Sequence, residues 1–248
     1  MSLLLEPYTL RQLTLLNRIA VSPMCQYSSV DGLANDWHLV HLGSRAVGGA
    51  GLIFTEATAV TPEGRITAQD LGLWNDEQIE PLQRITRFIR AQGAVAGIQL
   101  AHAGRKASTH RPWLGKHGSV KVEEGGWVPV GPSPIAFDPQ HTAPVQLDET
   151  QSNEVIQAFV AAAKRALEAG FSVVEVHAAH GYLLHQFLSP LSKQRSDQYG
   201  GSFENRIRFA VEIVKATREK VGPNFIIIFR LSMLDLVEGG SNWQEIVQ

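Results

Sequence analysis

The sequence predicts an α/β protein built as a (β/α)8 TIM barrel that is truncated after its fifth strand. Five short apolar segments alternate with longer amphipathic segments of helical period. The apolar runs are nearly continuous rather than alternating, which is typical of parallel strands covered on both faces. Strands joined by crossover helices fit either an open doubly wound sheet or a barrel.

Two further observations favour the barrel. No G-x-G-x-x-G follows the first predicted strand, so the dinucleotide-binding fingerprint of a Rossmann domain is missing. Polar residues also recur at the carboxyl ends of the predicted strands, where barrel enzymes place their chemistry. These residues are Cys25, Glu56, Gln99, His177 and Arg230.

The predicted elements alternate regularly along the chain. The strands are expected over residues 19–24, 52–57, 95–100, 172–178 and 225–232, and the helices over residues 36–49, 75–93, 148–170 and 201–222. Thr150 is the expected N-cap of the third helix and Ser202 that of the fourth. Glycine ends the helical segments, as is common at helix C-termini.

A long insertion follows the third strand, over about residues 101–148. It is rich in Gly, Pro, His and Trp, and Trp113, Trp127 and Phe137 provide apolar anchors. Loops of this length are usually functional or contain small elements of their own. Because only residues 233–248 follow the fifth strand, we expect residues 1–248 to form one incomplete barrel domain.

Composition limits the class of protein. A hydrophobic content of 44% over 248 residues is enough for a large core, and no low-complexity tract is present. The net charge of −2, without a basic stripe, gives no reason to expect a nucleic-acid partner. No apolar run is long enough to cross a bilayer, and Glu6 interrupts the N-terminal apolar residues. A single cysteine, Cys25, fits a cytoplasmic protein.

The segment HAAHGY, residues 177–182, closes the fourth predicted strand. A metal site is a weak interpretation, because there is no H-E-x-x-H motif and no cysteine pair. The rings could simply satisfy each other's hydrogen bonds. Alternatively, His177, His180 and Tyr182 could polarise a carbonyl and protonate a neighbouring carbon. The two histidines converge only if the chain turns after residue 178, as a helical turn would allow.

Three other polar residues within apolar strands need an explanation. Arg230 lies in IIIFRLS, where an unpaired charge is very unfavourable. Glu56 or Glu175 is the structural candidate for its partner, and an anionic cofactor is the functional candidate. Gln99 needs partners for both its amide donor and its acceptor. Cys25 is either a buried, inert residue or a polarisable thiol beside a cofactor.

Taken with this pattern, several segments resemble the old yellow enzyme family of FMN-dependent ene-reductases, especially its thermophilic-like subclass. The resemblance extends over essentially the whole chain in the family's order. The segments are SPMCQY (22–27), LIFTEATAVTPEGR (52–65), IQLAHAGRKA (98–107), HAAHGYLLHQFLSPLSKQRSDQYGGSFENR (177–206) and the strand that contains Arg230.

The resemblance implies a (β/α)8 barrel with FMN across its carboxyl-terminal mouth. Cys25 would tune the redox behaviour of the flavin, and Gln99 would reach its pyrimidine edge. Arg230 would lie near N1 and the C2 carbonyl, where its charge stabilises the reduced flavin. The residues assigned to the flavin in this way are Ser22, Pro23, Met24, Cys25, Ala57, Gln99 and Arg230.

The resemblance also implies a reaction. NADPH, or NADH, would reduce FMN, and an α,β-unsaturated carbonyl compound (an enone-type substrate) would then be reduced in a ping-pong sequence. His177 and His180 would hydrogen-bond the substrate carbonyl, Tyr182 would protonate its α-carbon, and Tyr27 would help to hold it. No metal is implied.

Family members extend beyond this chain, into the last strands and the loops that hold the FMN phosphate. They are expected to form homo-oligomers. We therefore expect the chain to be a fragment of a longer reductase, or a barrel completed by a partner chain, or an inactive truncated barrel that acts only in assembly. Another alternative is a flavoenzyme like the dienoyl-CoA reductases, although one cysteine cannot ligate the iron–sulfur cluster of that class.

Overall fold

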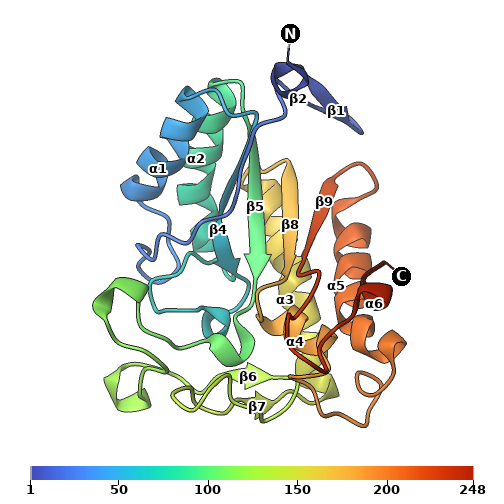
Figure 1. Ribbon diagram of the computed structural model, residues 1–248. Helices are drawn as coiled ribbons and strands as arrows, with labels where there is room; N and C mark the ends of the chain where they lie inside the picture. The colour runs from blue at the N-terminus through green and yellow to red at the C-terminus, as the bar shows by residue number, and fades with distance from the viewer. Residues whose placement is uncertain (1, 248) are drawn as a thin grey trace.

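A computed structural model describes residues 2–247 of the chain. Five parallel strands form one curled sheet whose spatial order follows the sequence (Figure 1). Their bounds are Ala20–Val21 (β3), Leu52–Ala59 (β4), Val95–Ala101 (β5), Val173–Ala178 (β8) and Ile226–Leu231 (β9). This sequential parallel order is that of consecutive strands in a (β/α)8 barrel, so the five predicted strands are confirmed.

The α-helices are Asp36–Val47 (α1), Ile79–Ala91 (α2), Glu149–Glu168 (α3), Leu183–Leu188 (α4), Phe203–Val221 (α5) and Trp243–Val247 (α6). The long helices α1, α2, α3 and α5 cover the outer face of the sheet, whereas the short α4 and α6 follow the carboxyl ends of β8 and β9 (Figure 1). Ser202 caps α5 as predicted, accepting the backbone N–H of Asn205. The prediction for α3 was wrong, because Asp148 is the N-cap and Gln151 completes a capping box.

The first strand is much shorter than the predicted residues 19–24. Only Ala20 and Val21 pair with β4. Pro23 has no N–H to offer a neighbouring strand, and the chain leaves the sheet before it. The following backbone N–H groups instead bond to the carboxylate of Glu56, which leaves residues 22–27 as a loop over the sheet edge.

An antiparallel hairpin of β1 (Tyr8–Leu10) and β2 (Leu13–Leu15) precedes the sheet and was not predicted. Strands of three residues are too short to show a clear period in the sequence. The hairpin lies at the amino ends of the barrel strands (Figure 1). Leu13 and Leu15 pack there against the small apolar cluster of Leu52 and Phe54.

The insertion after β5 lies at the opposite end of the sheet (Figure 1). It contains short 3-10 turns and the two-residue strands Val130–Gly131 (β6) and Val145–Gln146 (β7). Its indole anchor Trp127 donates to the carbonyl oxygen of Glu63 at 2.9 Å. The guanidinium of Arg65 lies over two rings, those of Trp74 and Trp127. The insertion is therefore tied to the loop that follows β4, at the carboxyl ends of the strands.

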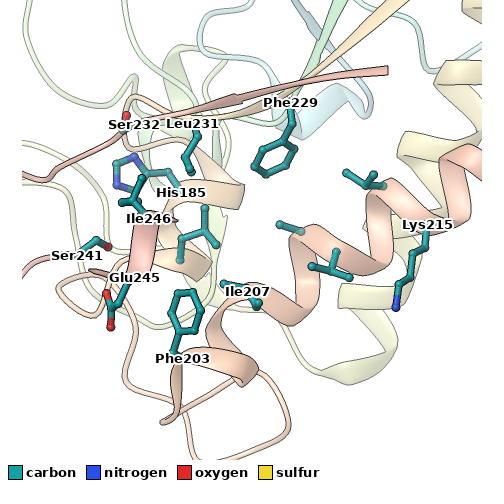
Figure 2. A pocket seen from close by; sticks show the side chains of 14 residues that line it. His185, Phe203, Ile207, Lys215, Phe229, Leu231, Ser232, Ser241, Glu245 and Ile246 are labelled. Atoms are coloured by element: carbon teal, nitrogen blue, oxygen red, sulfur yellow. The ribbon is translucent and has the colours of Figure 1, made fainter. Parts of the chain in front are cut away.

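Burial differs along the sheet. Every residue of β4, β5 and β8 is buried, whereas β9 has only Ile226 fully buried. An apolar groove runs between α5 and β9, with Phe203, Ile207 and Phe229 among its lining residues (Figure 2). Within residues 2–247, no helix combines the length and apolar character needed to cross a membrane.

Candidate active site

The three rings of HAAHGY come together at the carboxyl end of β8. The ring centroids of His177 and His180 are 5.0 Å apart, and those of His177 and Tyr182 are 5.1 Å apart. Both pairs meet edge to face. His177 lies on β8 and is buried, whereas His180 is exposed and Tyr182 is half-buried. The segment therefore groups one buried imidazole, that of His177, with two more accessible rings at the carboxyl end of β8.

A tight turn produces this convergence. His180 and Gly181 both have positive φ, 61° and 74°, and Tyr182 N donates to Ala179 O at 3.2 Å. Two consecutive left-handed residues are the signature of a type I′ turn. The predicted turn after residue 178 is confirmed, and it is made by this β-turn instead of the helical turn that would also have allowed it. Glycine tolerates a left-handed position and histidine is less suited to it, so α4 begins only at Leu183.

One hydrogen bond shows which nitrogen of the His177 ring can act as a donor. Its Nδ1 accepts the backbone N–H of Ala179 at 3.4 Å, so Nε2 carries the proton of the neutral ring. Burial lowers the pKa of His177 to about 3, and the nearby His180 and Arg230 add to this effect. Burial also lowers the pKa of His180. Both rings are neutral near pH 7, and His177 offers an N–H toward the site.

Tyr182 keeps its proton. Burial, followed by the charges of Cys25 and Asp70, raises the pKa of the phenol well above its usual value. The ammonium of Lys106 lies 4.9 Å from the centre of the Tyr182 ring and donates to the carbonyl oxygen of His180 at 3.0 Å. A protonated phenol beside neutral imidazoles can donate a hydrogen bond or a proton at neutral pH.

A row of three side chains, two of them polar, crosses three neighbouring strands beneath these rings. Ala57, Gln99 and Glu175 are paired in register across β4, β5 and β8. Gln99 Nε2 donates to Glu175 Oε1 at 2.6 Å, and the Arg230 guanidinium lies 3.8 Å from the same oxygen. Burial raises the pKa of Glu175, against the opposing effects of Gln99 and Arg230.

These contacts decide between the two structural partners considered for Arg230. Glu175 is its carboxylate neighbour, because His177 and Arg230 are paired in register and Glu175 lies two residues before His177 on β8. Glu56 is engaged elsewhere, with His38 Nε2 at 3.0 Å from its Oε1. One third of the Arg230 side chain is exposed, and its contact with Glu175 is longer than a hydrogen bond. Its guanidinium therefore retains donors for another group.

The loop after β3 brings Cys25 and Tyr27 to the same region. Glu56 Oε2 holds this loop by accepting the backbone N–H of Gln26 at 2.8 Å. Burial, with the charges of Asp70 and Glu56, raises the pKa of the Cys25 thiol to about 12. Burial likewise raises the pKa of Tyr27, with contributions from Cys25 and Tyr182.

Two further contacts define the surroundings of this loop. The ring of Tyr27 meets that of Trp113, from the insertion, edge to face at 5.7 Å. Ala57 and Tyr182 line one small cavity together with Asp70. Ser22 and Met24 are exposed and Pro23 is half-buried, between the end of β3 and Cys25.

The residues over this sheet fit the ring of a flavin, which the resemblance implies. The pyrimidine edge of that ring alternates donors and acceptors, and Gln99 and Arg230 place an amide and a guanidinium on β5 and β9. Ala57, a residue with a small side chain, is paired in register with Gln99 on the neighbouring strand β4. A guanidinium that stays charged suits a ring that gains negative charge on reduction. The assignment of individual residues to FMN stays a prediction.

Sequence reasoning missed Lys106, and it named Glu56 without finding its role. Lys106 holds the carbonyl oxygen of His180, and Glu56 holds the loop that contains Cys25. The sequence carried a signal for each. Lys106 is a cation in the loop directly after a buried strand, and Glu56 is a carboxylate inside one. Residues 2–247 contain no group of three or more His, Cys, Asp or Glu side chains placed to hold a metal ion.

Comparison with known proteins gives consistent matches. The chain is 50% identical over 242 residues to an NADH:flavin oxidoreductase of Gibberella zeae, covering 96% of this chain and 59% of that protein. It is 48% identical over 240 residues to an NADPH dehydrogenase of Bacillus subtilis, covering 96% of this chain and 65% of that protein. The chain thus spans about three fifths to two thirds of the length of these relatives.

Solved structures support the same fold. Morphinone reductase matches with a TM-score of 0.82 and 31% identity, covering 93% of this chain and 62% of that one. The old yellow enzyme of Pichia sp. matches with a TM-score of 0.81 and 29% identity, covering 96% and 61%. The predicted barrel fold of old yellow enzymes is confirmed. A family model matches residues 3–248, and the chain belongs to the NADH:flavin oxidoreductase / NADH oxidase family, whose cofactor is FMN.

Proposed function

We propose that the chain, within its whole protein, is an FMN-dependent NAD(P)H oxidoreductase that reduces the activated C=C bond of α,β-unsaturated carbonyl compounds. One observation carries the proposal. His177, His180 and Tyr182 converge on one side of a sheet whose adjacent surface carries Gln99 and Arg230. Donors for a carbonyl oxygen thus lie beside a surface suited to a flavin ring.

Each side chain has a separate role in the proposed reaction. His177 Nε2–H and the neutral ring of His180 bind the carbonyl oxygen of the substrate and stabilise negative charge that develops there. Tyr182, whose raised pKa keeps it protonated, supplies a proton to the α-carbon. Tyr27 bounds the substrate on the side of the insertion, where it meets Trp113.

FMN, when bound, supplies hydride exchange with the nicotinamide and with the activated alkene. We assign its ring to the loop of Ser22, Pro23, Met24 and Cys25 and to the sheet residues Ala57, Gln99 and Arg230. Within that surface Arg230 provides the permanent positive charge and Glu175 orients the Gln99 amide. Either NADPH or NADH is the reductant, and the names of the bacterial relatives favour NADPH.

We further propose that residues 1–248 belong to a single FMN-binding domain. The insertion supports this, because it is tied by Trp127 to the loop after β4 rather than folding apart. A homo-oligomer is the expected assembly for the whole protein. The lone cysteine, Cys25, fits a reducing cytoplasm.

A second candidate is reduction of an unsaturated CoA thioester. A 2-naphthoyl-CoA reductase matches the fold with a TM-score of 0.88 and 29% identity, covering 99% of this chain and 37% of that one. Identity to the flavin oxidoreductases and NADPH dehydrogenases is higher, which favours the simpler carbonyl substrate.

Anaerobic mixing experiments test the proposal. The protein is loaded with FMN, reduced with NADPH and mixed with 2-cyclohexen-1-one or with 2-naphthoyl-CoA, while flavin absorbance is followed. We expect the enone to reoxidise the flavin faster than the thioester. Reoxidation by the thioester alone would favour the second candidate. A folded protein that does not retain FMN through gel filtration would instead support a role in assembly only.

A further inference from the structure

The turn that gathers the three rings is held from outside by side chains. His180 N–H donates to Ser232 Oγ at 3.0 Å, and Gly181 N–H donates to His185 Nδ1 at 3.0 Å. Gly181 O accepts from Gln186 Nε2 at 2.7 Å. Ser232 follows β9, whereas His185 and Gln186 lie on α4. The turn is therefore held between the helix after it and the loop after the next strand. We call the three side chains that hold it, those of Ser232, His185 and Gln186, the clamp.

The clamp matters because the turn is strained. A non-glycine residue in the left-handed region is unfavourable and persists only where its surroundings impose it. His180 is such a residue, and it carries one of the rings proposed to bind substrate. If the clamp were released, the backbone of His180 would relax toward ordinary φ values, and its ring would move away from His177.

His185 can hold the turn in one tautomer only. To accept the Gly181 N–H, its Nδ1 must be unprotonated, so the proton of the neutral ring resides on Nε2. Nε2 lies 2.6 Å from Asp235 Oδ1, which accepts that proton in a hydrogen bond. The carboxylate thus selects the tautomer that the turn requires.

Asp235 is itself fixed on its other side. Its Oδ2 accepts from Ser189 Oγ at 2.8 Å and from the backbone N–H of Ser241 at 2.9 Å. The Asp235 side chain is 8% exposed and that of His185 is 13% exposed. Figure 2 shows His185, Ser232 and Ser241 gathered at one end of the apolar groove. This arrangement joins the loop after β9 to the substrate turn by a chain of directed hydrogen bonds.

We propose that Asp235 is a positioning residue for substrate binding and protonation, acting through His185 on the turn at residues 179–182. It lies behind His185, on the side away from the turn, and orients the rings that face substrate. This inference rests on the proposed function of His177, His180 and Tyr182. It extends that function to the loop after β9, which sequence reasoning had left without a role.

A double-mutant cycle tests the route of the effect. Asp235→Ala is expected to slow reoxidation of reduced flavin by 2-cyclohexen-1-one by about ten- to hundredfold, since small misplacements of catalytic groups have effects of that size. Reduction of the flavin by NADPH is expected to change less than about threefold, because that step does not require the three rings. Asp235→Asn, which retains one acceptor oxygen for Nε2–H, is expected to be less impaired than Asp235→Ala.

His185→Asn supplies the second arm of the cycle. The amide oxygen of asparagine can take the place of Nδ1 as acceptor for the Gly181 N–H, and it needs no tautomer selection. We expect Asp235→Ala to have little further effect in the His185→Asn background. An equal loss in both backgrounds would overturn the proposal, because Asp235 would then act by another route.

The control variant is Asp138→Ala, which breaks a second short histidine–aspartate contact in the exposed part of the insertion. His141 Nδ1 lies 2.7 Å from Asp138 Oδ1. This variant should leave both half-reactions close to wild type. A slowdown equal to that of Asp235→Ala would mean that the assay reports general damage, and the positioning role would fail.

A measurement that needs no flavin provides an independent check. Long-range ¹H–¹⁵N correlation spectra of the histidine rings report which nitrogen carries the proton. We expect His185 as the Nε2–H tautomer in the unmodified chain and a mixture of tautomers in Asp235→Asn and Asp235→Ala. A wild-type His185 with its proton on Nδ1 would overturn the proposal even if no variant folds. If wild-type flavin is not reoxidised by any enone while the tautomer changes as expected, the proposed function fails and the clamp remains.

Discussion

The centre of the sheet and its β9 edge position their functional side chains in different ways. On β8, His177 is fixed by a strand that is buried at every residue. On β9, Phe229 and Leu231 flank Arg230 and are exposed, so packing alone holds this strand less firmly. Yet His177 and Arg230 are paired in register, and the proposed site uses both.

The difference shows two sources of precision in one site. Burial from both faces fixes the residues of β5 and β8, whereas hydrogen bonds to side chains hold the segment after β9. Ser232 and Asp235 make such bonds to the turn and to α4. We therefore expect substitutions at the centre to lower stability, and substitutions in the β9 loop to lower activity before they lower stability.

The largest expected effect is a loss of stability, tested by making the same Ile→Ala substitution on the central strand β5 and on the edge strand β9. Ile98→Ala on β5 removes a fully buried side chain and should lower the free energy of unfolding by about 2–5 kcal/mol. Ile228→Ala on β9 removes a half-buried side chain and should lower it by less than about 2 kcal/mol. Urea denaturation of the two variants measures both values. Equal losses would show that the edge is packed as firmly as the centre.

A second prediction concerns pH and the buried ring of His177. Its pKa is lowered to about 3 in the folded protein, against an unperturbed 6.5. Above pH 6.5 the ring is neutral in both states and its contribution to stability is fully present. As the pH falls from 6.5 toward 3, the unfolded chain takes up a proton that the folded protein does not, and that stability is lost.

His177→Asn should therefore reduce the dependence of unfolding free energy on pH between 6.5 and 3, by up to about one proton per molecule. Urea midpoints measured at several pH values test this. If His177→Asn has the wild-type slope, the ring is not held in its neutral form by burial.

The smallest expected effect concerns Cys25, which follows β3 at the edge of the sheet opposite β9. Because burial and nearby carboxylates raise the pKa of its thiol to about 12, almost none is thiolate at pH 8. We expect iodoacetamide to label the native chain much more slowly than the urea-unfolded chain. Comparable rates would show an accessible, reactive thiol and would remove the physical basis for placing it as an uncharged group beside the flavin.

Much of this fold was readable from the sequence because the central strands are buried on both faces and leave continuous apolar runs. The first strand and the N-terminal hairpin were misjudged or missed, since two or three paired residues carry too little pattern. Among site residues, HAAHGY was visible because three rings stood together. The clamp was not, because it depends on His185 and Asp235, fifty residues apart, and on the tautomer of one ring.

The most direct test of the central claim compares the two half-reactions in the FMN-loaded protein with both His177 and His180 changed to Ala. The account predicts that reoxidation of reduced flavin by 2-cyclohexen-1-one slows by about a hundredfold or more, since donors to a developing oxyanion are removed. Flavin reduction by NADPH should stay near the wild-type rate. Equal losses in both half-reactions, or none in reoxidation, would contradict the role of these rings in binding the substrate carbonyl.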